Sequence, residues 1–364
     1  MRVVLLGAGH IGHTIARLLS ESGDFEVSVV DQSEQALARL GDAEVRTHVA
    51  DTADPNALLA AMRGHETVVN ALPYHLATVA ATQAREAGCH YFDLTEDVAA
   101  TRAIQRLADG APTAFMPQCG LAPGFVGIVA HHLARPFDTL HDVKMRVGAL
   151  PAFPTNALKY NLTWSVDGLI NEYCHPCEAI RDGEALEMLP LEGLEHFSLD
   201  GVEYEAFNTS GGLGTLCGTL AGRVRTLDYK SVRYPGHRNL VKMLLEELQL
   251  KDDPETLKQI LRKAVPSTMQ DVVLVFVTVS GLRHGALVQE VFARKIFADR
   301  SEARPLSAIQ ITTAAGLCAV LDLFREGALP QRGFIRQEQV ALPAFLANRF
   351  GRAYQQSRQV ESIA

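Results

Sequence analysis

The sequence lacks the signals that mark nucleic-acid-binding and membrane proteins. It has no run of lysine or arginine longer than scattered pairs, and its net charge of −8 offers nothing that would attract a phosphate backbone or an anionic membrane. No uninterrupted apolar stretch approaches the length of about 20 residues that a membrane-spanning helix needs. We therefore expect neither nucleic acid nor a membrane as a partner.

A secretory leader and a metal-binding pattern are also missing. Met1-Arg2-Val3 leads straight into an apolar run instead of a signal segment, so we expect a cytoplasmic protein with reduced thiols. Cys174 and Cys177 have the spacing of a zinc half-site or a redox pair, but no second CxxC or HxxxH pair accompanies them. We interpret this spacing as coincidence and predict no metal site.

A glycine-rich loop stands near the start of the chain. The segment Gly7-Ala8-Gly9-His10-Ile11-Gly12 follows the apolar run Val3-Val4-Leu5-Leu6 and precedes a helical pattern. In dinucleotide sites the first glycine permits a tight turn, the second lets the backbone approach the pyrophosphate, and the third lets helix and strand pack closely. The free N–H groups at the helix start face the phosphates. The loop therefore predicts a bound dinucleotide.

A carboxylate closes the second apolar run. Asp31 follows Val27-Ser28-Val29-Val30, where a carboxylate would bind the adenosine ribose hydroxyls and repel a 2′-phosphate. We therefore favour NAD over NADP, although Arg17 and Arg39 leave a phosphate partner open. The cofactor-binding residues that we expect are Gly7, Gly9, His10, Ile11, Gly12, Asp31, Gln32, Asp51, Thr52, Asn70, Ala71, Leu72 and Pro73.

Length and pattern together predict two domains. In the first part, short β-branched runs alternate with helical patterns, which is typical of a doubly wound parallel sheet of the α/β class. The expected strands are 2–6, 26–30, 45–50, 67–71, 90–94 and 113–116, and the expected helices are 11–21, 33–40, 55–63, 76–87 and 98–109. We assign residues 1–120 to this Rossmann domain.

The pattern changes after Gly124. We expect a helix over 125–134 and then strands near 142–148, 224–229, 271–280 and 286–293, which suit a mixed or antiparallel sheet. These elements form a second α+β domain, 121–305, that would bind the substrate. A helix over 307–325 begins a C-terminal segment, 306–364, that could return to pack on the Rossmann domain.

Several short motifs occur in an order that resembles one family. They are Asn70-Ala71-Leu72-Pro73-Tyr74, Tyr91-Phe92-Asp93-Leu94, Gly120-Leu121-Ala122-Pro123-Gly124, Lys159-Tyr160-Asn161, Trp164-Ser165, Glu205 to Gly212, and Arg233-Tyr234-Pro235-Gly236-His237. With the glycine loop they resemble the saccharopine dehydrogenase-like family, and within it the L-lysine 6-dehydrogenase branch. The resemblance implies a second domain that mediates a homodimer, and oxidation of an amine on an amino-acid substrate.

Oxidation of a C–N bond needs a neutral amine, a hydride path to a nicotinamide and a proton acceptor. His237, fixed by a Pro-Gly turn, is the leading acid/base candidate because imidazole titrates near neutral pH, and Asp93 at a strand end competes with it. Lys159 is the third catalytic candidate, and it shares with Arg233 the chance of pairing a substrate carboxylate. The substrate-binding residues that we expect are Tyr74, Thr95, Gly124, Tyr160, Thr209, Ser210 and Arg233.

These observations predict NAD-dependent oxidation of the ε-amine of L-lysine to the semialdehyde, which cyclises to piperideine carboxylate. A saccharopine reductase or another opine-type or polyamine-type dehydrogenase stays open, and its second carboxylate would need a cation such as Arg223, Arg225 or Arg238. An NADP-dependent carbonyl reductase with a phosphate pocket near Arg39 also stays open. So does a catalytically idle NAD-binding sensor or scaffold, because a fold alone does not establish catalysis.

Overall fold

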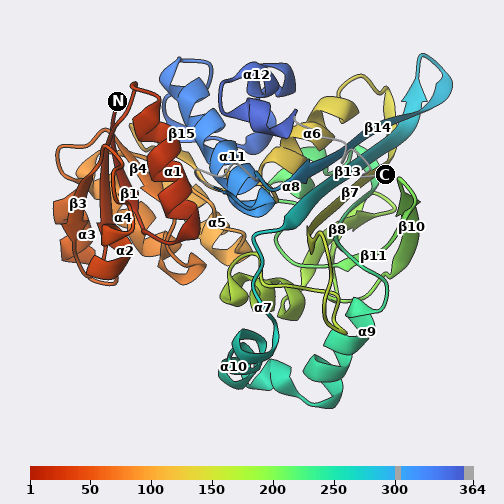
Figure 1. Ribbon diagram of the computed structural model, residues 1–364. Helices are drawn as coiled ribbons and strands as arrows, with labels where there is room; N and C mark the ends of the chain where they lie inside the picture. The colour runs from red at the N-terminus through yellow and green to blue at the C-terminus, as the bar shows by residue number, and fades with distance from the viewer. Residues whose placement is uncertain (300–304, 356–364) are drawn as a thin grey trace, which may run out of the picture. The chain divides into compact units, whose positions relative to one another are not determined.

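The chain divides into two compact units in the computed structural model, which describes residues 1–299 and 305–355 (Figure 1). The first unit combines Met1–Ile128 with Thr312–Ala353, and the second contains the described residues of Val129–Ile311 together with Tyr354 and Gln355. The chain thus passes between the units after Ile128, Ile311 and Ala353, and the boundaries expected from the sequence, at 120/121 and 305/306, stay predictions. Each unit is described by itself below.

The first unit is built on a parallel sheet. Among the described residues it has seven strands in the order β15-β6-β5-β4-β1-β2-β3. They are β1 (Arg2–Leu6), β2 (Glu26–Asp31), β3 (Arg46–Val49), β4 (Thr67–Asn70), β5 (His90–Asp93), β6 (Ala114–Met116) and β15 (Gly333–Phe334). The doubly wound sheet predicted from the sequence is confirmed, and β15 extends it at the β6 edge.

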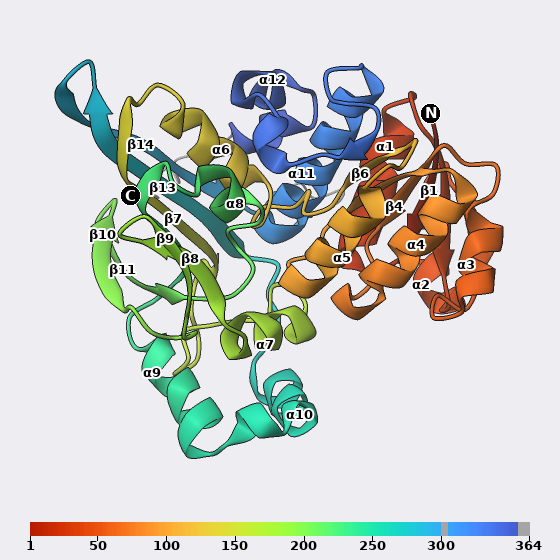
Figure 2. The same cartoon turned by 180° about the vertical axis from the view of Figure 1, so that it is seen from behind.

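Helices cover this sheet where the apolar periodicity predicted them. They are α1 (His10–Glu21), α2 (Glu34–Ala38), α3 (Pro55–Met62), α4 (Ala77–Ala87) and α5 (Val98–Ala108). Figure 2 shows α3, α4 and α5 on one face of the sheet, where Leu58, Ala81 and Ile104 pack against Val68 and Tyr91. The alanines of α4 allow that helix to lie close to its neighbours because they carry so little side-chain volume.

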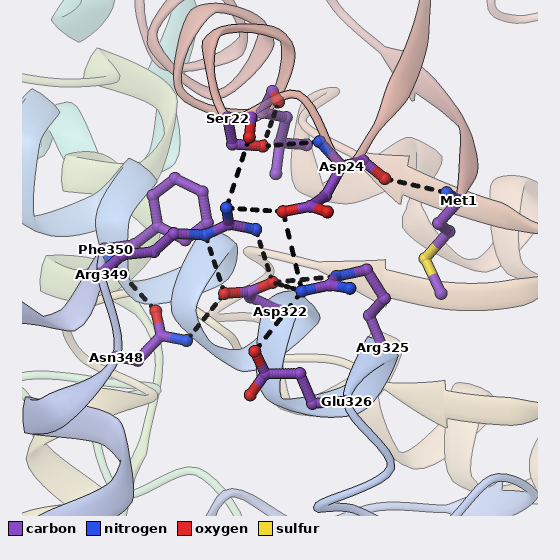
Figure 3. Close-up of polar contacts among 10 residues, drawn as sticks. Met1, Ser22, Asp24, Asp322, Arg325, Glu326, Asn348, Arg349 and Phe350 are labelled. Atoms are coloured by element: carbon purple, nitrogen blue, oxygen red, sulfur yellow. Dashed lines mark hydrogen bonds and ion pairs between the residues drawn. The ribbon is translucent and has the colours of Figure 1, made fainter.

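A buried ion cluster ties the C-terminal return segment into the first unit (Figure 3). The side chain of Asp322 is 2% exposed and lies in α11 (Ala308–Arg325). It accepts hydrogen bonds from Arg325 and Arg349 at 2.8–3.0 Å and from Asn348 at 2.9 Å. Arg349 also reaches Asp24, ahead of β2, at 2.6 Å. We call Asp322, Arg325, Asn348, Arg349 and Asp24 the Asp322 cluster.

Helix α11 is long and apolar enough, by length and composition, to cross a membrane. Gln310, Asp322 and Arg325 interrupt its apolar residues, so the expectation that the sequence holds no uninterrupted apolar run of that length stands. Within the protein, however, 83% of this helix is buried, and Leu317 and Leu321 are fully covered. Packing inside the protein therefore accounts for its apolar character. The remaining helix of the return segment is α12 (Leu342–Ala347).

The second unit holds a mixed sheet of eight strands within the part of the chain that the structure describes. They are β7 (Thr139–Pro151), β8 (Cys177–Arg181), β9 (Glu184–Met188), β10 (Glu195–Leu199), β11 (Val202–Asn208), β12 (Val224–Arg233), β13 (Asp271–Arg283) and β14 (Ala286–Phe297). Strand β12 runs parallel to β7, and the other pairings are antiparallel. The mixed sheet predicted from the sequence is confirmed, although β8 to β11 were not anticipated.

The helices α7 (Val166–Cys174), α9 (His237–Lys242) and α10 (Pro254–Ala264) contribute to a separate apolar cluster of the second unit. Two further helices lie outside this cluster: α6 (Phe125–Ala134), within which the division between the units falls, and α8 (Leu216–Leu220). Leu169, Val241 and Leu261 bring α7, α9 and α10 together against Tyr160 and Phe207. This cluster holds the loop before α7 against the end of β12, where the polar residues described below are located.

Candidate functional site

The glycine loop contains two glycines that the fold itself requires. Gly7 has φ +100°, and a Cβ there would lie 2.9 Å from the Ala71 carbonyl oxygen. A Cβ on Gly12 would lie 2.0 Å from the carbonyl oxygen of Gly7, so the turn between β1 and α1 cannot accept one without moving. A side chain at either position would therefore disrupt the loop, whatever the loop binds.

Gly9 differs from both, because a Cβ there would meet no atom within 4 Å. It is the N-cap of α1 and provides no side-chain hydrogen bond to the first turn, which contains no acidic residue. Gly9 and His10 are exposed, and Ile11 is half-buried. An open space beside uncapped N–H groups is what a pyrophosphate needs. The residues present therefore fit a dinucleotide.

The Asp31 carboxylate belongs to the same loop. Its Oδ2 accepts a hydrogen bond from the Ala8 N–H at 2.7 Å, and its Oδ1 accepts one from the Ser33 N–H at 2.8 Å. These bonds leave lone pairs on both oxygens for a ribose hydroxyl. Gln32 is exposed beside it. Arg17 is occupied by Asp42 at 2.9 Å.

The carboxyl ends of β3 and β4 carry the other expected cofactor residues. Asp51 is exposed and accepts a bond from its own turn, while Thr52 is buried. Asn70 is 2% exposed, and its Oδ1 accepts the Leu72 N–H at 3.1 Å. Asn70 therefore shapes the turn that contains Ala71, Leu72 and Pro73. Whether this turn binds cofactor stays a prediction.

Asp93 lies at the end of β5 with both carboxyl oxygens in use. It is 1% exposed and accepts hydrogen bonds from the Tyr91 hydroxyl at 2.9 Å, the Thr95 N–H at 3.0 Å and the Gln118 N–H at 2.9 Å. Burial raises the pKa of Asp93 to about 6 despite these donors. Its bonds hold the β5 exit to the segment after β6. They give Asp93 a structural role beside the predicted catalytic one.

Glu96 is a candidate that the sequence analysis missed. It is half-buried in the short segment between β5 and α5. Burial, followed by the charges of Asp97 and Asp93, raises the pKa of Glu96 to about 7. The only sequence signal was an acidic residue just after a strand end. That signal is weak because Asp97 beside it serves as the N-cap of α5.

The first unit also holds three of the expected substrate residues. Tyr74 begins a short 3₁₀ turn and is half-buried, and Thr95 is buried against Asp93 and Asp97. Gly124 has φ +133°, and a Cβ there would lie 2.1 Å from the Gly120 carbonyl oxygen. The fold therefore needs glycine at this position without any ligand.

The second unit brings together Tyr160, Arg233 and His237 of the expected residues. Arg233 is 3% exposed; its Nε donates to the Tyr173 hydroxyl at 2.9 Å and a terminal nitrogen donates to the Val232 carbonyl at 2.8 Å. Its guanidinium carbon lies 5.0 Å from the ring centroid of Tyr160. Its direct partners in the described chain are these neutral groups, and the charge of the buried Glu172 also acts on it electrostatically. A buried cation whose direct partners are neutral suits a further anion.

Further polar groups beside this cation have no hydrogen-bond partner in the described chain. The Tyr160 hydroxyl and Thr163 Oγ1 are buried and unpaired, as is Asn161 Oδ1. The Tyr160 hydroxyl lies close enough to Trp164 and Thr163 for both to influence its pKa. Arginine, hydroxyl and indole groups are all hydrogen-bond donors. The donors of Tyr160 and Arg233 would therefore suit a carboxylate.

His237 is buried and fully hydrogen-bonded. Its Nδ1 lies 2.8 Å from the Leu158 carbonyl oxygen and its Nε2 lies 3.0 Å from the Tyr173 hydroxyl. Burial, with a smaller contribution from the Arg233 charge, lowers the pKa of His237 to about 3. The imidazole is therefore neutral at physiological pH, and it is a weak proton acceptor.

The other expected residues of the second unit do not join this group through their side chains. Lys159 is exposed with φ +49°, and its Nζ donates to the Pro235 carbonyl at 3.0 Å. The Thr209 hydroxyl bonds to the Ser231 hydroxyl at 2.8 Å, and the Ser210 hydroxyl bonds to the Pro176 carbonyl at 2.8 Å. Their roles in catalysis or substrate binding stay predictions.

The cysteines and possible metal ligands form no further centre in the described part of the chain. Cys174 and Cys177 are free thiols, and burial raises the pKa of Cys177 to about 12. No group of three or more His, Cys, Asp or Glu side chains is arranged to hold a metal among the described residues.

Comparison with known proteins covers both units. The saccharopine dehydrogenase NADP binding domain matches residues 3–115, and the saccharopine dehydrogenase C-terminal domain matches residues 120–350. An apo saccharopine dehydrogenase (L-Glu forming) from Saccharomyces cerevisiae is similar in structure, with a TM-score of 0.78 at 15% identity, over 94% of this chain and 96% of that one. A DAP dehydrogenase from C. glutamicum gives a TM-score of 0.47 at 11% identity, over 98% and 99% of the two chains.

Proposed function

The chain belongs to the saccharopine dehydrogenase family, and from this premise we propose that it catalyses NAD-dependent oxidation of the ε-amine of L-lysine. The family match and the shared fold support the broader activity, an oxidoreductase acting on the C–N bond of an amino acid. Lysine as the substrate and NAD as the cofactor are the finer parts of the proposal. The motif order, Asp31 and the polar cluster at Arg233 support them.

In the proposed reaction the substrate Cε–H bond breaks with its electron pair and the amine nitrogen loses a proton, which leaves an imine. Water then adds to the imine, ammonia leaves, and the resulting semialdehyde cyclises with its own α-amine. When bound, the nicotinamide supplies the hydride acceptor. The chain has to bind the substrate carboxylate, accept one proton and admit one water molecule.

The observation that carries the proposal is the buried cation of Arg233, whose direct hydrogen-bond partners are a hydroxyl and a carbonyl. In an amino-acid dehydrogenase, an α-carboxylate would provide a direct ion pair for this cation, and the Tyr160 hydroxyl would donate a further hydrogen bond to that carboxylate. An idle NAD-binding scaffold would have no use for such a cation. Arg233 therefore favours an enzyme over a sensor.

For the proton we favour Glu96 over the three residues expected from the sequence. Asp93 has three donors on its two oxygens, His237 is a weak base, and Lys159 is exposed. A carboxylate with a pKa of about 7 can accept a proton at neutral pH and release it again. Glu96 also follows β5 at the sheet edge where ligands of this fold class bind.

The cofactor preference rests on charge. Asp31 places a carboxylate where a 2′-phosphate would have to lie, and Glu34 adds a second acid in the first turn of α2. Arg39 is exposed and could bind a phosphate instead, and the matching family domain is named for NADP. We therefore propose NAD as the cofactor, and faster turnover with NADP would contradict this choice.

The assay that tests the proposal follows nicotinamide reduction by absorbance with NAD or NADP and a panel of amines at alkaline pH. The panel contains L-lysine, L-ornithine, saccharopine, diaminopimelate, and cadaverine, which is lysine without its carboxylate. Turnover of L-lysine but not of cadaverine would support both the substrate and the carboxylate site. Turnover of saccharopine alone would favour the reductase alternative. No turnover at all, together with tight NAD binding, would favour the scaffold.

A variant pair tests the proton acceptor. With Glu96→Gln, kcat/KM at neutral pH should fall about 100-fold, and its rise with pH through about 7 should disappear, because the base is removed. Glu86→Gln, in an exposed position on α4, is the matched control and should change neither. An unchanged pH profile in Glu96→Gln would return the role to Asp93.

A homodimer is also part of the proposal. Strand β14 is the last strand of its sheet among the described residues, and its Leu287 and Val291 are 73% and 49% exposed on the same strand face. Apolar residues grouped in this way are typical of protein interfaces. Light scattering should give twice the chain mass. A monomer at micromolar concentration would contradict this part.

A further inference from the structure

The hydrogen bonds around His237 have a direction that the chemistry of their ends determines. The Leu158 carbonyl can only accept, so His237 Nδ1 carries the proton of that 2.8 Å bond. The neutral ring then has a bare Nε2, which must accept from the Tyr173 hydroxyl 3.0 Å away. The Tyr173 oxygen in turn receives the Arg233 Nε–H at 2.9 Å. One continuous chain of bonds therefore runs from a backbone carbonyl to the buried guanidinium.

This chain of bonds cannot serve as a proton wire. Proton transfer along it would require a group at its end that takes up or releases a proton, and the Leu158 carbonyl does neither near neutral pH. Arg233 at the other end also keeps its proton throughout the physiological range. Tyr173 and His237 are both buried, so no solvent proton enters in the middle. The chain fixes orientation and does not transport charge.

The Arg233 guanidinium is held on three sides. Nε is bound to Tyr173, a terminal nitrogen is bound to the Val232 carbonyl, and the Tyr160 ring faces the guanidinium carbon at 5.0 Å. The Tyr160 ring also packs on the His237 ring at a centroid distance of 5.3 Å. Since the fold uses these N–H groups, the remaining ones are presented in one fixed direction.

The surrounding charges keep His237 in the state that this arrangement needs. Arg233 on β12 disfavours a second positive charge, and Glu172 on α7 acts electrostatically on Arg233, Tyr160 and Tyr173. A protonated ring would donate from Nε2, so the Tyr173 oxygen would accept from two cations and its own hydroxyl proton would lose its acceptor. The arrangement is therefore most favourable with a neutral imidazole.

We propose that His237 and Tyr173 are positioning residues, which orient the Arg233 guanidinium toward the substrate carboxylate through the bonds Leu158–His237–Tyr173–Arg233. This inference rests on the proposed function in one respect, namely that Arg233 binds the substrate carboxylate. The bonds themselves do not depend on that function. His237, expected from the sequence to exchange protons with the substrate, lies two hydrogen bonds from Arg233 and therefore three from the substrate carboxylate in this proposal.

The first test reads the bonds directly by NMR of the full chain labelled at histidine nitrogens. The expected His237 signal is that of the neutral ring with its proton on Nδ1. Because the pKa of His237 is about 3, the number of protons on the ring should change by less than about 0.2 between pH 5 and 9. Tyr173→Phe keeps the ring but removes the donor, so the Nε2 resonance should shift toward that of an unbonded nitrogen. A His237 that titrates near neutral pH, or that carries its proton on Nε2, would overturn the proposal.

The second test separates positioning from acid/base chemistry in the turnover of the amino-acid substrate. His237→Leu should raise KM about tenfold and lower kcat less than threefold, since a misaligned charged hydrogen bond costs about 1.5–3 kcal/mol. His237→Gln can offer an amide oxygen to the Tyr173 hydroxyl and should restore KM to within about threefold of wild type. A loss confined to kcat, with no rescue by glutamine, would contradict a positioning role.

Arg233→Leu in the same assay distinguishes failure of the carboxylate site from failure of the positioning role of His237 and Tyr173. If KM is insensitive to Arg233→Leu, the proposed carboxylate site fails, whatever the NMR result. If Arg233→Leu raises KM strongly while His237→Leu and Tyr173→Phe do not, the positioning inference alone fails. Thermal melting of each variant shows whether it folds, and Tyr173→Phe preserves the ring packing if His237→Leu does not.

Discussion

The two units each contain a buried cluster around arginine, and the clusters differ in one respect. In the Asp322 cluster of the first unit, Arg325 and Arg349 both share a buried carboxylate, and Arg349 has a second partner in Asp24. The direct partners of Arg233 in the described part of the second unit are neutral tyrosine, carbonyl and aromatic groups, and the charge of Glu172 also acts on it. A cation that shares a buried carboxylate serves structure, and one whose direct partners are neutral is available to a ligand.

Replacing Arg233 is the strongest way to test this contrast. Arg233→Leu should weaken binding of the amino-acid substrate by about 2–5 kcal/mol, a factor of roughly 30 to 4,000 in KM, because the charge pair with the substrate carboxylate is lost. The free energy of unfolding should also fall, by about 1–3 kcal/mol, because Arg233 donates two buried hydrogen bonds and its charge acts on the buried Glu172. Substrate kinetics and urea unfolding measure the two quantities.

Arg262→Leu is the control, because Arg262 is 60% exposed and pairs with Asp167 only at 3.6 Å. It should alter neither quantity. A large loss of stability in Arg233→Leu without an effect on KM would place Arg233 among the structural cations.

Breaking the paired cluster should give the opposite result. Asp322→Asn leaves Arg325 and Arg349 without their shared counter-charge and should lower the free energy of unfolding by about 3 kcal/mol, with KM for the substrate unchanged. Asp42→Asn removes an exposed partner of Arg17 and should cost less than about 1 kcal/mol. Equal effects from the two variants would mean that burial does not strengthen the Asp322 cluster.

The glycine loop offers the same contrast at a smaller scale. Gly12→Ala forces a Cβ against the Gly7 carbonyl and should cost about 1–3 kcal/mol of stability, or more, together with cofactor binding. Gly9→Ala meets only open space, so stability should stay within about 0.5 kcal/mol while NADH binds about tenfold more weakly. Melting curves and fluorescence titration with NADH compare the pair. Normal NADH affinity in Gly9→Ala would contradict the idea that the open space beside Gly9 receives the pyrophosphate.

The Asp31 carboxylate is a group whose hydrogen-bonding capacity the fold uses only in part. Asp31→Ser removes the negative charge and should shift the ratio of kcat/KM for NAD over NADP about tenfold toward NADP. Some stability should be lost with the bond to Ala8. Asp51→Ser, at the next strand end, is the control and should leave the ratio within about twofold. A ratio that does not move would point to Arg39 as the determinant.

The smallest predicted effect is on acid stability. Burial alone raises the pKa of Asp322, and hydrogen bonds from Arg349, Asn348 and Arg325 outweigh it, so the pKa lies below its ordinary value of 3.8. The stability that this carboxylate contributes is therefore present above pH 3.8 and is lost as pH falls through the lower, folded value. Urea unfolding at a series of acid pH values should show this loss in wild type and a flatter profile in Asp322→Asn.

Local patterns predicted the part of the fold that local interactions determine. Strands β1 to β6 and helices α1 to α5 match their expected ranges closely, because each is an apolar run or an amphipathic period bounded by turn residues. Strand β15 is only Gly333–Phe334, and it exists because it pairs with β6 more than two hundred residues earlier. Strands β9 and β10 are largely exposed, so they lack the apolar alternation that identifies a strand.

The candidate sites divide in the same way. The glycine loop is a backbone site, and its requirements are visible as residue types at fixed spacing. The role of His237 depends on Tyr173, sixty-four positions away, which donates to its Nε2. A sequence shows that a histidine is present, but not which nitrogen carries the proton. Glu96 was hidden for a related reason, because its high pKa comes from burial that no residue pattern reports.

The course of the chain through the first unit has a consequence for synthesis on the ribosome. Residues 1–128 emerge first, but β15, Asp322 and Arg349, which complete this unit, follow only after residues 129–311 have been made. Until then β6 lacks its neighbouring strand β15, and Asp24 lacks its ion pair with Arg349. The cofactor-binding half therefore waits as an unfinished sheet while nearly two hundred further residues are translated, and in that interval a chaperone would have most to protect.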